Sequence, residues 1–175
     1  MDKKLVDIVA TYSTAVSRLP ALSEADIVEF EKRLPGNLPD DVRELLMYCS
    51  GFECATGEVV RLTGAGDVGF GQVIPFALAV MADGFGNFWV VDVDAQGAWG
   101  VVFYISHDPP VLAVQADNLQ DFLEQVRDLC VHGVHRMTDF VRNEAVTRIW
   151  KDDPFVIPVP AARDARDAVV AKFAA

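Results

Sequence analysis

The sequence predicts a single α+β domain, with N-terminal helices, a central antiparallel β-sheet meander and C-terminal helices packed on that sheet. The chain has 175 residues, 51% of them hydrophobic, which is enough for one continuous core. Helical periodicity is confined to the two ends, whereas Glu58 to Gln115 contains short β-type runs separated by glycine- or proline-bearing turns. Turns this short favour antiparallel neighbours, because parallel strands need long crossovers. We therefore expect one domain over residues 1–175.

The first residues, from Met1 to Val16, begin like a secretory signal, with Lys3 and Lys4 ahead of an apolar stretch. Asp7 interrupts that stretch, and no small-residue cleavage site follows it. We interpret this segment as an amphipathic helix of the mature chain and predict that the protein stays in the cytoplasm. No apolar run approaches the roughly 20 residues that span a bilayer, so we predict no membrane association.

Two helices joined by a short turn are predicted next. Ser23 is placed to cap the first helix, over Ser23–Leu34, with Asp26 in the capping-box position. Residues 35–37 form a turn. The second helix begins near Leu38 and Pro39, because proline suits a first helical turn, and it ends at residues 50–51.

The middle of the chain is predicted to form the sheet. The candidate strands are Glu58–Leu62, Val73–Phe76, Ala77–Ala82, Asn87–Val93, Trp99–Ile105 and Val111–Gln115. Residues 83–87 and 94–97 have the composition of hairpin turns. Because Phe88 to Val93 is nearly all apolar, we expect that strand to lie centrally in the sheet.

The C-terminal part is predicted to be helical. The strongest amphipathic stripe in the chain belongs to a helix from about Asn118 to His132. A further helix is expected from Met137 to Trp150, followed by a stiff extended link at residues 158–160. The alanine-rich stretch Ala161–Ala175 favours a helix that either docks on the core or mediates formation of a homodimer. Residues 132–175 are thus expected to be a helical extension.

Charge and cysteine content constrain the partners and the compartment. Twenty-six acidic against fifteen basic residues give a formal charge of −11, which disfavours nucleic acid and attracts a basic protein partner. Solubility alone also explains such a charge. The three cysteines (Cys49, Cys54 and Cys130) cannot all pair within the chain, and we expect free thiols in a reducing compartment.

Two motifs have a possible chemical interpretation. Residues 64–69 match a dinucleotide-binding fingerprint, but the following Phe70–Pro75 is unsuited to the helix that this mechanism requires, so we expect a loop. Cys130, His132 and His135, with the other two cysteines, are zinc-ligand types and are the basis of an alternative function, a small metal-dependent hydrolase. Their spacing matches no closed zinc motif, and we predict no metal, no cofactor and no catalytic site.

An acidic and aromatic surface is the predicted contact site for a partner protein. Phe85 lies between two glycines at a turn tip, where there is little core to join. Three aspartates are expected near one end of the same hairpin, and a tryptophan follows the next turn; they have no EF-hand spacing. The predicted partner-binding residues are Asp83, Phe85, Asp92, Asp94 and Trp99. Trp89 is interpreted as core, because tryptophan is mostly buried.

Several short motifs occur in an order that resembles the SUKH superfamily. The first is Phe30 and Glu31 on a helix, then Leu38, Pro39 and Asp40, then a short helix ending at Ser50 and Gly51. The second is a strand pair starting at Phe76, with Gly84 and Gly86 in its turn and an apolar strand ending at Asp92. The third is the strand and helix over Val114–Leu123. The resemblance spans about residues 22–131.

The SUKH superfamily includes Smi/Knr-type fungal cell-wall-assembly regulators and many bacterial toxin-immunity proteins. The resemblance therefore implies an α+β domain without an active site that recognises another protein. In bacteria that partner is often a toxin, frequently a nuclease or a deaminase. It also implies structural roles for Glu31, Leu38, Pro39, Gly51, Gly84 and Gly86. The function we expect is an immunity protein that neutralises a toxin, and the alternative is an intracellular adaptor or scaffold.

Overall fold

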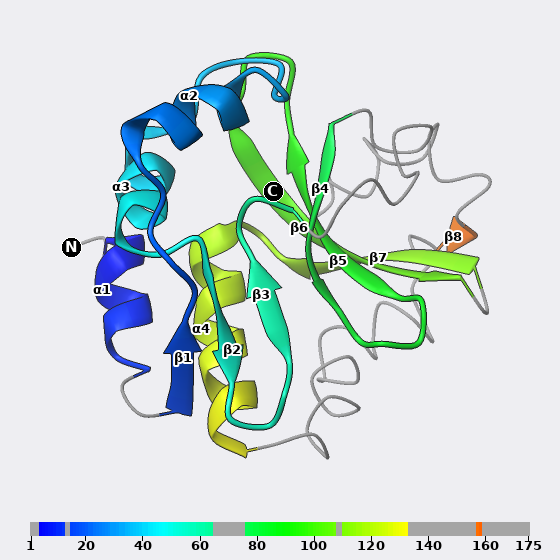
Figure 1. The fold of residues 1–175 in the computed structure, drawn as a ribbon. Helices are drawn as coiled ribbons and strands as arrows, with labels where there is room; N and C mark the ends of the chain where they lie inside the picture. Colours follow the sequence, from blue (N-terminus) through cyan, green and yellow to red (C-terminus); the bar gives the residue numbers. More distant parts are fainter. Residues whose placement is uncertain (1–3, 13–14, 65–75, 108–109, 133–156, 159–175) are drawn as a thin grey trace.

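The computed structural model describes residues 4–12, 15–64, 76–107, 110–132 and 157–158, and these form an α+β fold (Figure 1). The elements in chain order are α1 (Leu5–Ala10), β1 (Val16–Arg18), α2 (Glu24–Glu31), α3 (Asp40–Tyr48), β2 (Gly51–Cys54), β3 (Val59–Arg61), β4 (Ala77–Ala82), β5 (Phe88–Val93), β6 (Trp99–His107), β7 (Pro110–Ala116), α4 (Leu119–His132) and β8 (Ile157–Pro158). The predicted fold class is confirmed.

The sheet is an antiparallel meander whose strand order follows the chain from β1 to β8. Each strand therefore pairs with the next one, as the short turns predict. β5 lies between β4 and β6, which confirms its central position. Four of the six predicted strands coincide with β4 to β7 and a fifth with β3, while most of the predicted strand Val73–Phe76 falls outside the described residues. β1 and β2 were not predicted.

Capping interactions explain where α2 and α3 begin. The Ser23 side chain accepts a hydrogen bond from the Asp26 backbone N–H, and the Asp26 carboxylate accepts one from the Ser23 backbone, which completes the predicted capping box of α2. Pro39 immediately precedes the first residue of α3 and takes the N-cap position. Both helices lie within the predicted ranges.

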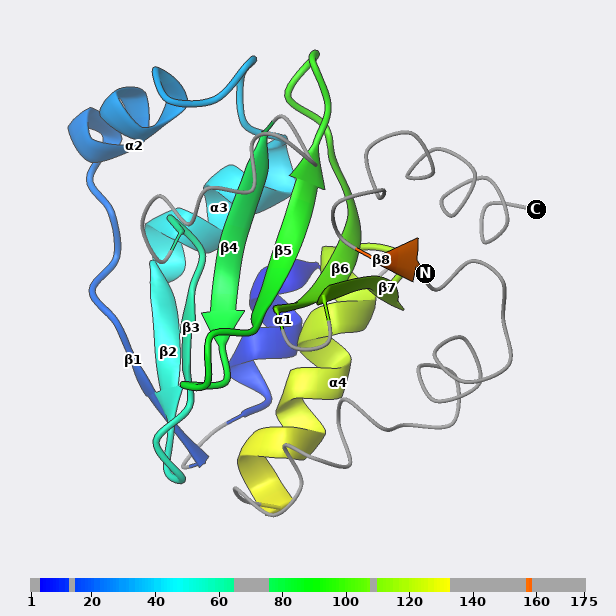
Figure 2. The same ribbon diagram turned by 90° about the vertical axis from the view of Figure 1, so that its right-hand side faces the viewer.

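The helices pack on one side of the sheet. Figure 2 shows α1, α3 and α4 behind the strands. The apolar stripe of α4 is buried against the sheet, with Phe122, Leu123 and Val126 each 0% exposed. The side chains between these helices and the sheet form the main core of the domain.

The N-terminal prediction is partly wrong. The helix does not reach Val16, because α1 ends at Ala10 and Val16 opens β1. The chain is instead fixed beyond α1 by Tyr12, whose hydroxyl donates a hydrogen bond to the backbone carbonyl of Leu123 on α4. Tertiary contacts of this kind override the weak helical preference of a short segment.

The prediction of free thiols fails for two of the three cysteines. Cys54 at the end of β2 and Cys130 on α4 form a disulfide across 76 residues of sequence. The prediction failed because spacing along the chain does not show which thiols the fold brings together. Cys49 remains a free, buried thiol, and burial raises its pKa.

Two further expectations concern the C-terminal part and the membrane. The predicted helices over Met137–Trp150 and Ala161–Ala175 lie outside the described residues, whereas Pro158 of the predicted stiff link belongs to β8. Among the described residues, no helix has the length and apolar character that crossing a membrane requires.

Candidate protein-binding site

The turn between β4 and β5 is held closed by one carboxylate. Asp83 Oδ1 accepts hydrogen bonds from the backbone N–H of Phe85 at 2.8 Å and of Asn87 at 3.1 Å, and Asp83 Oδ2 accepts one from the Asn87 side-chain amide at 2.6 Å. Gly84 and Gly86 have φ values of +79° and +89°, which glycine adopts without strain. The turn is thus stabilised from inside, and the residue between the two glycines faces outward.

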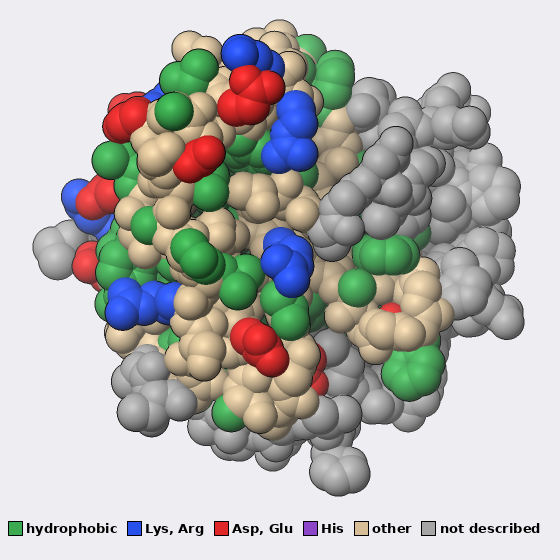
Figure 3. Space-filling view, viewed as in Figure 1, with side chains coloured by type: hydrophobic (Ala, Val, Ile, Leu, Met, Phe, Trp, Pro, Cys, Tyr) green, Lys and Arg blue, Asp and Glu red, His purple; other side chains and the backbone are tan. Residues whose placement is uncertain are grey.

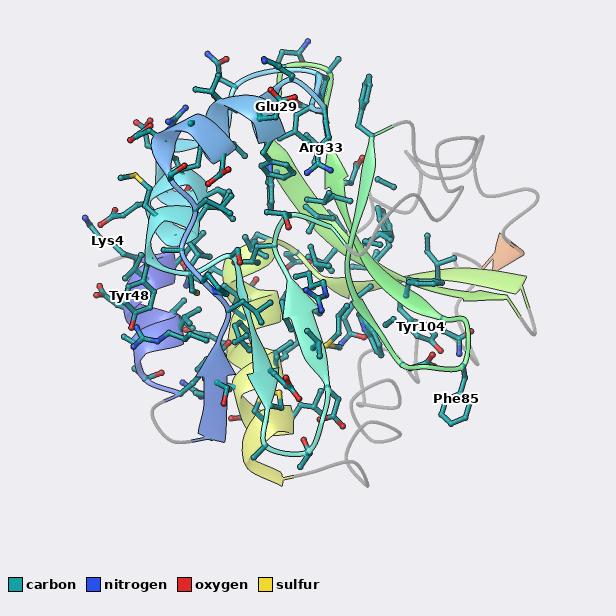
Figure 4. All side chains as sticks on the ribbon, viewed as in Figure 1. Lys4, Glu29, Arg33, Tyr48, Phe85 and Tyr104 are labelled. Carbon is teal, nitrogen blue, oxygen red and sulfur yellow. A yellow bond between two sulfur atoms is a disulfide. The ribbon has the colours of Figure 1, made fainter. Side chains whose placement is uncertain are left out.

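Phe85 is that residue, and its side chain is 82% exposed. Figure 4 shows its ring at the end of the hairpin, pointing away from the rest of the fold. The other large hydrophobic residues exposed in the described part of the chain are less so, with Val28 at 50%, Met47 at 47% and Phe76 at 42%. An aromatic ring on a preorganised turn is suited to anchor an interface, because little conformational entropy is lost on binding.

The turn between β5 and β6 is also closed by hydrogen bonds to an aspartate, but it packs against the rest of the domain. Asp94 Oδ1 accepts hydrogen bonds from the backbone N–H groups of Gln96 at 2.8 Å and Ala98 at 2.9 Å. Gly97 packs against the loop between α2 and α3, where an added Cβ would lie 2.6 Å from the Asn37 carbonyl oxygen. This turn is therefore docked on the body of the domain, although Asp94 itself is exposed.

The remaining predicted residues lie inward. Asp92 is only 8% exposed, and Trp99 is partly buried against the main core. Among the described residues, the Trp99 indole N–H has no hydrogen-bond partner. Trp89 is fully buried, and its indole N–H donates to Gln115 Oε1 at 3.0 Å, which confirms its interpretation as core.

The five predicted contact residues therefore do not form one patch. Asp83 and Phe85 lie before β5, whereas Asp92, Asp94 and Trp99 lie at or after its other end. A strand rises about 3.3 Å per residue, so the six residues of β5 separate the two groups by roughly 17 Å. The expectation that the three aspartates lie near one end of the hairpin is wrong. Asp83 is close to Asp92 and Asp94 in sequence, but the length of β5 separates them in space.

The residues that carry the family resemblance have structural roles at the helix pair. Glu31 Oε1 accepts hydrogen bonds from the Leu38 backbone N–H at 3.1 Å and from Arg43 Nη2 at 2.7 Å. Leu38 is 5% exposed, and Pro39 precedes α3. Glu31 thereby joins the end of α2 to the start of α3.

Gly51 and the two turn glycines are required by backbone geometry. Gly51 has φ +152°, and an added Cβ would lie 2.1 Å from the Val60 carbonyl oxygen on β3. No side chain fits there without moving β3 away from β2. Gly84 and Gly86 give the hairpin tip the conformation described above.

An acidic row on α4 was not predicted from the sequence. Asp121, Glu124 and Asp128 follow one another at intervals of three and four residues, which places them on one side of α4, and Asp117 lies two residues before the helix begins. Burial and the carboxylates of Asp117 and Glu124 raise the pKa of Asp121. The spacing is visible in the sequence, beside the apolar stripe of the same helix.

The other side of the domain has a different distribution of charge. The face in Figure 3 carries acidic and basic side chains interspersed, with no broad area of one sign. Arg43, for example, bridges Glu24 at 2.9 Å and Glu31 at 2.7 Å. By contrast, α4 carries a single basic residue, Arg127.

The cysteine and histidine group proposed as zinc ligands is not assembled within the described residues. Cys130 is bonded to Cys54, so neither offers a thiolate to a metal while the disulfide is intact. His135 and the side chain of His132 fall outside the described part. The described residues contain no group of three or more His, Cys, Asp or Glu residues arranged to hold a metal ion.

Comparison with known proteins assigns the chain to a family. The model of the SMI1/KNR4 family (SUKH-1) matches residues 21–125, which is more than half of the chain. The chain belongs to this family. No curated protein and no solved structure matches the chain.

The SUKH-1 match runs from α2 into about the first two turns of α4, close to the range of the resemblance seen in the sequence. It includes Glu31, Gly51 and the β4–β5 hairpin with Phe85. The N-terminal α1 and β1, the last residues of α4 and everything after them lie outside the match. The disulfide therefore joins a cysteine inside the matched range to one beyond it.

Proposed function

We propose that the chain is a non-catalytic protein-binding domain and that it acts as an immunity protein, which binds and neutralises a toxin. The observation that carries this proposal is Phe85, an 82% exposed aromatic ring on a turn held rigid by Asp83. A few anchor residues, often aromatic, contribute most of the binding energy of a protein interface. Membership of the SUKH-1 family supports the immunity role, because such proteins are often immunity proteins.

Charge indicates the kind of partner. Residues 1–132 contain twenty acidic and eight basic residues, and α4 adds an acidic row in which Asp128 pairs with Arg127 at 3.5 Å. A basic toxin domain, such as a nuclease or a deaminase, would be attracted to this surface, and its association rate would fall as salt is added.

The proposed compartment is the cytoplasm, and the disulfide is the observation that tests this proposal. Disulfides are rare in reducing compartments, so the Cys54–Cys130 bond argues against a permanently reduced cytoplasmic protein. The redox state of the protein in its host decides this point.

Isolation of the partner tests the function. The tagged full chain is recovered from its native host, and bound proteins are identified by mass spectrometry. One stoichiometric enzyme that loses activity on binding supports the immunity role. Several housekeeping proteins would favour the alternative, an adaptor or scaffold, and would contradict the proposal.

Phe85→Ala tests the hairpin tip as the anchor. We expect the affinity for the isolated partner to fall by about 30-fold, since an anchor residue contributes about 2 kcal/mol or more. The free energy of unfolding should not change, because the ring contacts solvent. Phe76→Ala is the matched control, the same substitution at an exposed ring at the opposite end of β4. Equal affinities for Phe85→Ala and the unmodified protein would remove the tip from the interface.

A further inference from the structure

The sheet has a second apolar face. Residues directly opposite each other in neighbouring antiparallel strands share a face. Ala79 pairs with Val90, Val90 with Phe103, and Phe103 with Val114, so these four residues form a row across β4 to β7. Ile105 follows two residues after Phe103 on β6 and lies on the same side. These five residues are named the outer face.

The outer face is buried but separate from the main core. Its exposed fractions range from 0% at Val90 and Phe103 to 4% at Val114. None of the five residues belongs to the cluster that packs with α1, α3 and α4. In Figure 2 those helices lie behind the strands, and no described helix stands in front of β4 and β5. An antiparallel sheet often leaves such a face to water and polar residues, whereas this face is apolar and needs a cover.

The strand β8 shows which part of the chain reaches this face. β8 pairs with β7 through Leu112 with Ile157 and Val111 with Pro158. Val114 is two residues from Leu112, which is about 7 Å along the strand, and paired strands lie about 4.8 Å apart. After leaving α4 at His132, the chain thus returns to the edge of the outer face at β8, with residues 159–175 still to follow.

The composition of residues 133–175 suits docking on an apolar face of an acidic domain. Apolar residues recur at helical spacing at Met137, Phe140, Val141 and Ile149. The segment holds seven of the fifteen Lys and Arg residues but only six of the twenty-six Asp and Glu residues, a net charge of +1. Residues 1–132 carry −12, so the two parts attract each other.

We propose that residues 133–175 dock on the outer face and cover it within the same chain. The occupant is thus a segment that the SUKH-1 match does not include. A consequence is that this face is closed to other proteins, which leaves the hairpin tip and the α4 row for a partner. The proposal rests on the sheet and on β8, and it holds whether or not the partner is a toxin.

Limited trypsin digestion of the full chain tests the docking, because the segment contains cleavage sites throughout. These sites are Arg136, Arg142, Arg148, Lys151, Arg163, Arg166 and Lys172. In Phe103→Ala, we expect cleavage of residues 133–175 at least about tenfold faster than in the unmodified protein, with residues 1–132 left intact. Phe122→Ala is the matched control, since Phe122 is also 0% exposed but lies in the main core, and its loss should expose sites in the body itself.

A second measurement keeps the test decisive if Phe103→Ala fails to fold. A site for a specific protease is inserted between Gly133 and Val134 of the otherwise unmodified chain, and the cut protein is run on size exclusion in native buffer. Co-elution of the two fragments supports docking. A C-terminal fragment that separates from a folded, monomeric body would overturn the proposal and assign the cover to residues 65–75. Unchanged digestion of the segment in a folded Phe103→Ala protein would also overturn it.

Discussion

The carboxylate of Asp83 determines the position of Phe85, although the two side chains do not interact. It accepts the backbone N–H of Phe85 and both the backbone and side-chain N–H groups of Asn87. A phenylalanine on a mobile loop would lose conformational entropy when it bound a partner, and the Asp83 hydrogen bonds reduce that loss. At the scale of single residues, the turn aspartate is therefore a positioning residue for the anchor.

Asp83→Ala separates positioning from direct contact. We expect the free energy of unfolding to fall by about 1–2 kcal/mol, because up to three hydrogen bonds are lost at a partly exposed site. The amide hydrogens of Phe85 and Asn87 should exchange faster, which hydrogen exchange measured by NMR detects. Asp83→Asn is the control, since its side-chain oxygen still accepts at Oδ1. Unchanged exchange in Asp83→Ala would show that the glycines alone maintain the turn.

The sequence predicted the exposed tip but not the whole surface. A phenylalanine between two glycines in a turn has few core neighbours, and this local feature was enough to place Phe85 outside. Asp92 and Asp94 required knowledge of the strand between them, because a strand moves neighbours in sequence far apart and turns alternate side chains to opposite faces. Burial of Asp92 at 8% exposure depends on tertiary packing, which no local pattern showed.

At the scale of elements, Tyr12 joins two segments that are distant in the sequence. Its hydroxyl donates to the Leu123 carbonyl in the middle of α4, and its ring packs edge-on against Phe52 of β2 at 4.9 Å between centroids. Burial raises the pKa of the Tyr12 phenol. The neutral phenol is thus the form that the folded protein favours.

Tyr12→Phe should change both stability and its dependence on pH. We expect a loss of about 1 kcal/mol at neutral pH from the missing hydrogen bond. Because the folded pKa is raised, the stabilisation from Tyr12 is fully present below pH 10, the ordinary pKa of tyrosine, and is lost as pH rises above it. Urea unfolding from about pH 8 to pH 11 should therefore show a shallower alkaline decline in Tyr12→Phe than in the unmodified protein.

Tyr48→Phe is the matched substitution for this series, because Tyr48 is a partly buried tyrosine on a different helix, α3. The same alkaline decline in all three proteins would show that Tyr12 does not titrate on unfolding, and the link between α1 and α4 would then depend on apolar packing.

Helices were easier to predict than the outer strands for a physical reason. The capping box at Ser23 and the apolar stripe of α4 are local and periodic, so they appear directly in the sequence. β1 and β2 have three and four residues, too few for a repeating pattern. β2 also begins at Gly51, where a helix-stop signal conceals the start of a strand.

At the scale of the whole molecule, the disulfide connects the end of β2, the strand next to the edge strand β1, with the last turns of α4. Cys54 is 2% exposed and Cys130 is 4% exposed, so the bond lies inside the protein. It closes a loop over a separation of 76 residues, which includes β3 to β7. A crosslink over so long a loop restricts the unfolded chain strongly and thereby stabilises the folded one.

Reduction of the disulfide is expected to lower the free energy of unfolding by about 4 kcal/mol, the entropy of closing a loop of this length. Urea unfolding with and without reductant measures the change, and Cys54→Ser with Cys130→Ser in one chain should be insensitive to reductant. Alkylation of protein denatured without reductant should label one thiol, Cys49. Three labelled thiols in protein taken rapidly from its host would show that the pair is reduced there, which would restore the cytoplasmic prediction. A single labelled thiol would instead place the working protein in an oxidising environment, where a toxin would be met before it entered the cytoplasm.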